Sequence, residues 1–206
     1  MKGFITNLAL FVVFCIVFSG LTACTATQPA TGNGNAAKSQ ANGATQTSDG
    51  KTSPYPMLAP AFADAEFELL DGTKSRISDR KGKVLLVNIW GTWCGPCRAE
   101  MPSLIAMQDQ YRDQGLEIIG LNIGDGGGTP EPLETIKKFV EQMKLNYTIA
   151  ISPNAVTAQF YAITKQSVVP QTLLIDREGR LRGVFLGGGR SIEASMKQNL
   201  DKTMSE

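Results

Sequence analysis

The sequence of 206 residues contains no histidine, and its charges nearly cancel, with 20 Lys and Arg against 19 Asp and Glu. Without histidine the chain cannot form histidine-based catalytic triads, mixed histidine–cysteine zinc sites or the attachment motif of c-type haem. A formal net charge of +1 offers no basic surface of the kind that binds nucleic acid, so we expect no nucleic-acid partner. We also predict no metal site and no cofactor, which directs attention to the four cysteines.

Long apolar runs are scarce, and the most prominent one lies near the N-terminus. Residues 8–18 are unbroken in apolar character and follow Lys2, which is the arrangement of a secretory signal peptide. The run is shorter than the roughly 20 apolar residues of a membrane-spanning helix. An uncleaved signal anchor over residues 4–21 is the alternative.

The four residues Leu21-Thr22-Ala23-Cys24 resemble the bacterial lipobox, whose cysteine is lipidated and becomes the N-terminus of the mature protein. We therefore predict a lipoprotein signal peptide over residues 1–23, removal of Cys15 and lipidation of Cys24. A chance cysteine beside an ordinary cleavage site is the alternative. Two acyl chains would anchor the chain stably to a membrane, which places the protein in the bacterial cell envelope, facing the periplasm or extracytoplasmic space.

The next segment is polar and rich in small residues. Residues 25–56 contain no Val, Ile, Leu, Met or Phe, so they cannot bury enough apolar surface to offset the entropy of ordering. We predict that residues 24–56 carry the lipid and form a flexible linker with a reach on the order of 30 Å. Residues 57–206 are long enough for one folded domain.

Strands and helices alternate along this domain. Continuous apolar runs predict buried strands, helical spacing and caps predict helices, and short turn motifs predict two hairpins. We predict strands over 66–70, 74–77, 84–90, 116–122, 147–151, 172–176 and 180–186. We predict helices over 94–114, kinked at Pro102 and stopped by Gly115; from Pro130, capped by Thr129; from Pro153 to Tyr161, capped by Ser152; and a final helix capped by Ser191 that ends near Met204. This order indicates an α/β fold with helices on both faces of the sheet.

The motif that carries chemistry is Trp93-Cys94-Gly95-Pro96-Cys97, between a buried strand and the start of a helix. Helix N–H groups and the helix dipole favour a thiolate at Cys94, and the two-residue spacing lets Cys97 resolve a mixed disulfide. A zinc half-site would need a second pair of ligands. A purely structural disulfide in so short a ring would hardly constrain the unfolded chain, and an inert buried pair is the remaining alternative.

Residues 87–102, Val-Asn-Ile-Trp-Gly-Thr-Trp-Cys-Gly-Pro-Cys-Arg-Ala-Glu-Met-Pro, resemble the thioredoxin superfamily, and within it the membrane-tethered TlpA/ResA-like branch. The resemblance implies a thioredoxin-like fold with a mixed central sheet, an N-terminal hairpin extension and an inserted helix and strand near 130–145. Asn88 stands where thioredoxins proper usually carry a buried aspartate. The resemblance implies instead that Glu100, one helical turn after Cys97, handles protons near the thiols; a solvated helix glutamate is the alternative.

The resemblance also implies a substrate-binding surface. Val169-Pro170-Gln171-Thr172 resembles the family's cis-proline loop, which faces the cysteine pair and binds an extended substrate chain. Trp93, Pro96, Val169 and Pro170 are the expected substrate-binding residues. An ordinary proline at the start of a strand is the alternative.

The function that the resemblance implies is a tethered thiol-disulfide oxidoreductase that reduces specific protein disulfides, for example in cytochrome c maturation, and is itself reduced by a membrane electron donor. Other hypotheses are a non-catalytic partner-binding lipoprotein, a disulfide oxidase and a peroxiredoxin-like enzyme. A peroxiredoxin would carry threonine three residues before its reactive cysteine, where Gly91 stands. The glycine clusters at 124–128 and 187–189 lack phosphate-loop spacing, and we interpret both as loops, the second beside the active site.

Overall fold

The computed structural model describes residues 53–206, so the predicted signal peptide, Cys24 and most of the predicted linker lie outside the described residues. The helices are α1 (Pro60–Ala63), α2 (Gly95–Tyr111), α3 (Leu133–Met143), α4 (Asn154–Thr164) and α5 (Arg190–Met204), with short 3-10 helices η1 (Ile77–Arg80) and η2 (Arg112–Gln114). The strands are β1 (Phe67–Leu69), β2 (Lys74–Ser75), β3 (Val84–Trp90), β4 (Leu116–Asn122), β5 (Thr148–Ile151), β6 (Gln171–Ile175) and β7 (Leu181–Leu186). In this part of the chain, every helix is too short or too polar to cross a membrane.

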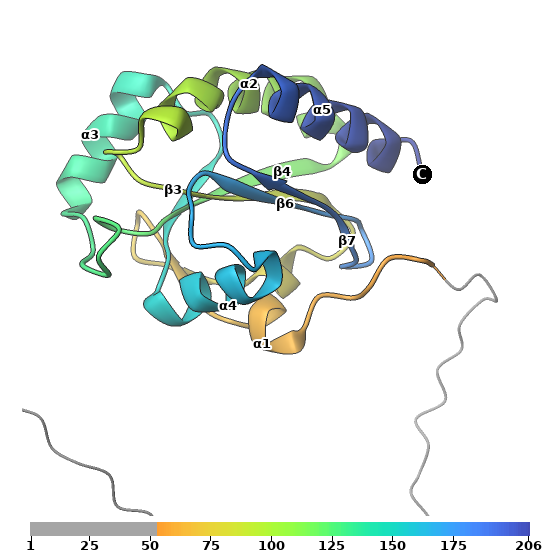
Figure 1. Ribbon diagram of the computed structural model, residues 1–206, viewed down its shortest axis with the longest axis horizontal. Helices are drawn as coiled ribbons and strands as arrows, with labels where there is room; N and C mark the ends of the chain where they lie inside the picture. Colours follow the sequence, from red (N-terminus) through yellow and green to blue (C-terminus); the bar gives the residue numbers. More distant parts are fainter. Residues whose placement is uncertain (1–52) are drawn as a thin grey trace, which may run out of the picture. The chain divides into compact units, whose positions relative to one another are not determined.

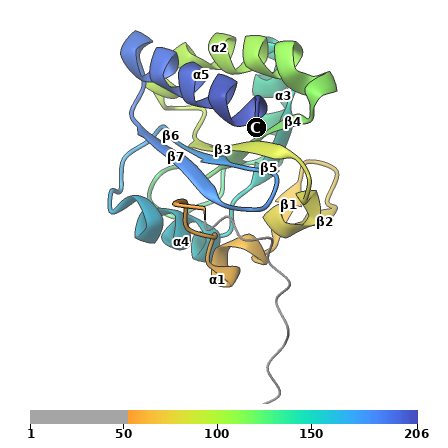
Figure 2. The same ribbon diagram turned by 90° about the vertical axis from the view of Figure 1, so that its right-hand side faces the viewer.

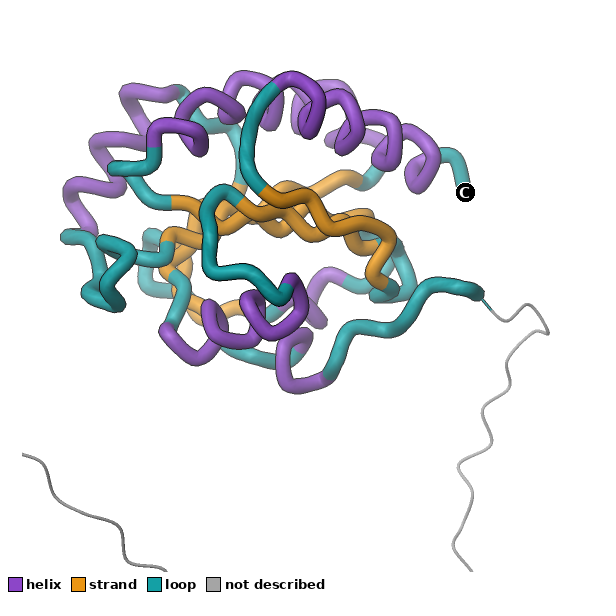
Figure 3. Tube along the Cα trace, viewed as in Figure 1, coloured by secondary structure: helices purple, strands orange, loops and turns teal. Residues whose placement is uncertain are grey.

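The strands form one mixed sheet in the order β2-β1-β5-β4-β3-β6-β7. The central strand β3 pairs in parallel with β4 and antiparallel with β6. Helices α2, α3 and α5 cover one face of the sheet, and α1 and α4 cover the other (Figures 1 and 3); the same layers are visible after a 90° turn (Figure 2). The predicted α/β architecture with helices on both faces is confirmed.

Strand β3 explains why the sheet divides the core into two layers. All seven of its residues are buried, and successive side chains point to opposite faces. Leu86 and Trp90 pack in the layer beneath α2 and α3, whereas Val87 and Ile89 pack in the layer that contains α1 and α4. Burial of apolar side chains on both faces fixes the position of the strand. The cysteine motif follows its C-terminal end.

The predicted bounds of β3 and β4 match the structure, and both hairpins are confirmed with small shifts at their ends. Helix α2 continues through Pro102. After η2 the chain turns at Gly115, whose φ of 96° lies in the left-handed region that glycine adopts without strain. The four-residue helix α1 was not predicted.

The predicted caps of the later helices are wrong. Thr129 closes a turn with Asp125, whose side chain accepts its N–H at 3.1 Å, and α3 begins only at Leu133. Pro132 disfavours helical geometry at Glu131, the residue before it, so a helix cannot begin at Pro130.

Helices α4 and α5 also begin at residues other than those predicted. Helix α4 begins at Asn154, after Pro153, and ends at Thr164; the Ser152 hydroxyl bonds the Thr157 hydroxyl instead of capping the helix. The N-cap of α5 is Gly189, and Ser191 lies inside the helix.

Candidate active site

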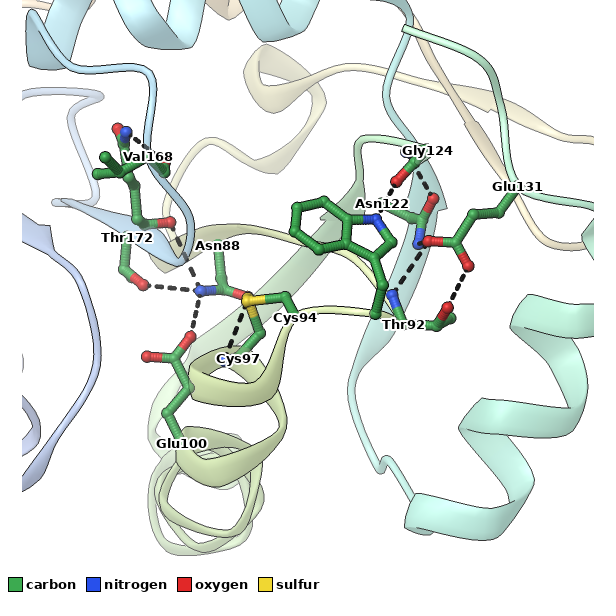
Figure 4. The surroundings of a disulfide bond; sticks show 12 residues. Asn88, Thr92, Cys94, Cys97, Glu100, Asn122, Gly124, Glu131, Val168 and Thr172 are labelled. Carbon is green, nitrogen blue, oxygen red and sulfur yellow. Dashed lines mark hydrogen bonds between the residues drawn. A yellow bond between two sulfur atoms is a disulfide. The ribbon is translucent and has the colours of Figure 1, made fainter. Parts of the chain in front are cut away.

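The cysteine pair lies at the start of α2, directly after the loop that follows β3. Cys94 is the N-cap of α2 and forms a disulfide with Cys97, whose backbone N–H also points at the Cys94 sulfur at 3.2 Å (Figure 4). Both residues are buried, but Cys94 at 3% exposure is the more accessible and Cys97 at 1% the less. After reduction, the same N–H and the helix dipole would favour a thiolate on Cys94, which is the arrangement expected of the attacking sulfur.

Glu100 lies one helical turn behind Cys97 and is buried, with 1% of its surface exposed. Its Oε1 accepts a hydrogen bond from Asn88 Nδ2 at 2.8 Å, and the same Asn88 nitrogen donates to Thr172 Oγ1 at 3.0 Å. Among residues 53–206, the second carboxylate oxygen has no hydrogen-bond partner. The carboxyl group therefore has one fixed oxygen and one oxygen available for a proton.

Burial raises the pKa of Glu100 to about 8, since a charged carboxylate loses hydration there; the Asn88 hydrogen bond opposes this, and the charge of Glu193 adds to it. A carboxyl group with a pKa raised this far changes charge much closer to neutral pH than an exposed glutamate does. Asn88 suits this arrangement because its amide donates to Glu100, whereas an ionised aspartate there would only accept and would repel the carboxylate.

The proline loop completes the other side of the site. The Val169–Pro170 peptide bond is cis, as the family resemblance predicts. Pro170 is buried and its carbonyl accepts the Gly187 N–H at 2.8 Å. Gly188 approaches the Pro96 carbonyl so closely that a Cβ would lie 3.2 Å from that oxygen. The second glycine cluster therefore lies beside the cysteine motif, as predicted.

Two large apolar side chains near the site are exposed. Trp93, which directly precedes Cys94, is 51% exposed, and Val168, in the loop before Pro170, is 48% exposed; Figure 4 shows Val168 on the side of Asn88 and Thr172. Val169, an expected substrate-binding residue, is partly buried, whereas its neighbour Val168, which was not predicted, is the exposed one. The Val168 carbonyl accepts a hydrogen bond from Gln171 Nε2 at 2.6 Å.

A closed ring of hydrogen bonds holds the segment just before Cys94, and the sequence analysis missed it. Glu131 Oε1 accepts the Thr92 N–H at 3.0 Å and Asn122 Nδ2 at 3.2 Å, and Glu131 Oε2 accepts the Thr92 hydroxyl. Asn122 Oδ1 accepts the Gly124 N–H at 2.9 Å, and the Gly124 carbonyl accepts the Trp93 indole N–H at 2.7 Å (Figure 4). Glu131 thus ties the cysteine loop to the end of β4.

Two glycines, one of them in the 124–128 cluster, leave space for the side chain of Trp93. A Cβ on Gly91 would lie 2.5 Å from the indole nitrogen, and one on Gly126 would lie 2.9 Å from the six-membered ring. Contacts this short would displace the indole. Glycine at both positions therefore leaves room for the indole of Trp93, which gives the 124–128 loop a structural role.

Glu131→Gln is expected to lower the free energy of unfolding by about 1–2 kcal/mol and to increase acrylamide quenching of Trp93 fluorescence. The amide keeps the shape of the carboxylate but carries no charge, so the bonds from the Thr92 N–H and Asn122 become weaker neutral ones, and the Thr92 hydroxyl has to reverse its bond and accept from the amide nitrogen. Urea unfolding and quenching measure the two effects, and the buried Trp90 should contribute little to the change in quenching.

Glu134→Gln is the matched control, because Glu134 is exposed on α3 and its ion-pair partner is Lys137. It should leave both readouts unchanged. If Glu131→Gln behaves like this control, Glu131 does not hold the loop.

Comparison with known proteins agrees with this geometry. Residues 58–184 match the model of the AhpC/TSA family. The chain is 33% identical over 143 residues to the thiol-disulfide oxidoreductase ResA of Geobacillus thermodenitrificans, covering 69% of this chain and 74% of that protein. It is 29% identical over 138 residues to the thioredoxin-like protein YneN of Bacillus subtilis, covering 67% and 76% of the two chains.

Solved structures show the same fold. A thiol:disulfide interchange protein of the thioredoxin family from Chlorobium tepidum superposes with a TM-score of 0.58 at 21% identity, covering 76% of this chain and 99% of that one. One from Bacteroides sp. gives 0.57 at 23% identity, covering 68% and 86%. The predicted thioredoxin-like fold is confirmed.

Proposed function

Because the chain belongs to the AhpC/TSA family and is a thiol-disulfide oxidoreductase of the ResA/DsbE type, we propose that it reduces disulfides of protein substrates outside the cytoplasm, for example in cytochrome c maturation. The observation that carries this proposal is the Cys94–Cys97 pair at the N-terminus of α2 with Glu100 buried one turn behind it. The reduced enzyme would be restored by a membrane electron donor of the thiol–disulfide type.

The first step is attack by the Cys94 thiolate on one sulfur of the substrate disulfide. A new disulfide forms between Cys94 and that sulfur, and the other substrate sulfur leaves as a thiolate that takes up a proton. We expect the substrate chain to cross Trp93, Pro96 and Val169-Pro170, because Trp93 and Pro96 are exposed beside the cysteines and the Val169 backbone can offer hydrogen-bonding groups. A substrate strand can bond to that backbone by strand addition.

The second step is resolution by Cys97. The ionised Glu100 carboxylate takes the proton of the Cys97 thiol, the resulting Cys97 thiolate attacks the Cys94 sulfur, and the second substrate sulfur leaves as a thiolate that takes up a proton. The enzyme ends as the Cys94–Cys97 disulfide and the substrate as a dithiol, so two electrons have passed to the substrate. Glu100 suits this role because its pKa of about 8 lets it change charge near neutral pH.

The proposal includes a lipid tether on Cys24, and the way the chain enters the domain supports it. The Pro56 carbonyl accepts the Leu181 N–H at 2.9 Å, and the Leu58 N–H donates to the Gly179 carbonyl at 3.1 Å. These contacts lie at the turn between β6 and β7, about 17 Å along β6 from Pro170. A tether that enters here leaves the cysteine pair free to meet substrates.

Two measurements on the full chain test this proposal. The Cys94–Cys97 couple should equilibrate near the potential of thioredoxin, about −270 mV, whereas a value near −120 mV would assign a disulfide oxidant. In a bacterial host the wild type should fractionate with membranes and Cys24→Ser should not; equal fractionation of both would remove the lipid anchor from the proposal.

A further inference from the structure

A groove lies near the cysteine motif and is lined by residues on either side of that motif in the sequence, Thr92 and Arg98. It has a volume of about 450 Å³ and lies between the start of α2 and the outer part of α3. We call it the basic groove; its lining residues are Thr92, Arg98, Thr135, Lys138, Phe139, Gln142 and Met143. Its lining thus combines apolar surface from α3 with polar and positively charged groups.

The charged residues that line the basic groove are both positive. Arg98 and Lys138 are both exposed, no carboxylate lines the groove, and among residues 53–206 neither cation forms an ion pair within 4.0 Å. The nearby Glu131 carboxylate is occupied by hydrogen bonds from Thr92 and Asn122. The two cations are therefore available to a ligand.

The groove lies within reach of a substrate bound to Cys94. Thr92 precedes Cys94 by two residues, and Arg98 follows it by one turn of α2, which is about 6 Å along the helix axis. An extended substrate chain advances about 3.3 Å per residue. A side chain two or three positions from the substrate cysteine would therefore enter the groove.

We propose that the basic groove is a specificity site that binds acidic side chains flanking the reactive cysteine of the substrate. A carboxylate can lie between the Arg98 guanidinium and the Lys138 ammonium while its methylene groups contact Phe139 and Met143. Lysine or arginine at the same substrate positions meets like charge instead. This inference rests on the proposed reduction of protein disulfides and adds the chemical class of the preferred substrate.

The test uses three disulfide-linked peptides that differ only at the second and third positions on both sides of the cysteine, which are all Glu, all Gln or all Lys. The reduced full-length protein is mixed with each peptide, and single-turnover rates are measured. The wild type should reduce the Glu peptide about three- to tenfold faster than the Lys peptide at low salt, and the ratio should fall toward one at 1 M salt.

Lys138→Glu should bring the Glu-to-Lys ratio to one or below. The ratio cancels any change that the variant makes in the reactivity of Cys94 itself. Lys137→Glu is the matched control, because Lys137 is the neighbouring lysine of α3 but does not line the groove; it should keep the wild-type ratio.

The outcomes separate the two proposals. If the wild type fails to reduce the Gln peptide, the proposed disulfide reduction is wrong. If all three peptides are reduced equally, or if Lys137→Glu and Lys138→Glu change the ratio equally, reduction stands and the specificity site is overturned.

Discussion

Replacement of Cys94 by serine is expected to lower the rate of disulfide reduction at least about a thousandfold, whereas replacement of Cys97 by serine should stop the reaction one step later. A serine hydroxyl remains protonated at neutral pH and does not replace a thiolate as nucleophile. With Cys94 intact, Cys97→Ser still attacks the substrate but cannot release it, so a mixed disulfide accumulates. Mass spectrometry without reductant should detect enzyme plus one substrate chain.

This expectation follows from the unequal positions of the two sulfurs. Cys94 is the N-cap of α2 and receives the Cys97 N–H, while Cys97 lies inside the first turn and is covered. Cys24→Ser is the control and should leave turnover of the purified protein unchanged. Trapping by Cys94→Ser instead of Cys97→Ser would reverse the assigned roles.

The parts of this site that sequence alone could predict are those fixed by local physics. The six apolar residues among the seven of β3 and the run that forms β4 indicate buried strands, and their bounds were predicted correctly. The position of Cys94 at a helix start follows from the adjacent strand and from Pro96, which favours the first helical turn. Helical spacing places Glu100 near the face of Cys97, but its burial is known only from the structure, since the sequence left a solvated glutamate open.

The parts that could not be predicted depend on residues distant in the chain. Glu131 is 39 residues from Thr92, and no local pattern indicates that its carboxylate closes the loop before Cys94. The sequence indicates only a plain loop at 124–128. The need for glycine at Gly126 comes from the indole of Trp93, which lies against it only in the folded chain. The predicted cap at Thr129 is wrong for a similar reason. Threonine is a common helix cap, but here its N–H bonds to Asp125 and Pro132 delays the start of the helix.

Glu100→Gln is expected to make the oxidised protein more stable than the wild type at pH 9 and about equally stable at pH 5. Folding raises the pKa of Glu100 from 4.5 to about 8, so between these values the folded state holds a proton that the unfolded state has released. The stabilisation from the protonated carboxyl is complete below the unfolded pKa and is lost as the pH rises through the folded pKa. Glutamine stays neutral and keeps an acceptor for Asn88, so the variant should gain several kcal/mol over wild type at pH 9.

Urea unfolding of the oxidised protein at pH 5, 7 and 9 measures this difference, and the exposed Glu141→Gln on α3 is the control that should follow the wild type. The same Glu100 variant should also slow resolution by Cys97, since no carboxylate remains to take its proton. The rate of substrate release from the mixed disulfide should then depend on pH only through the thiol itself. Parallel stability curves and an unchanged pH profile for resolution would together show that Glu100 neither titrates near pH 8 nor serves the thiols.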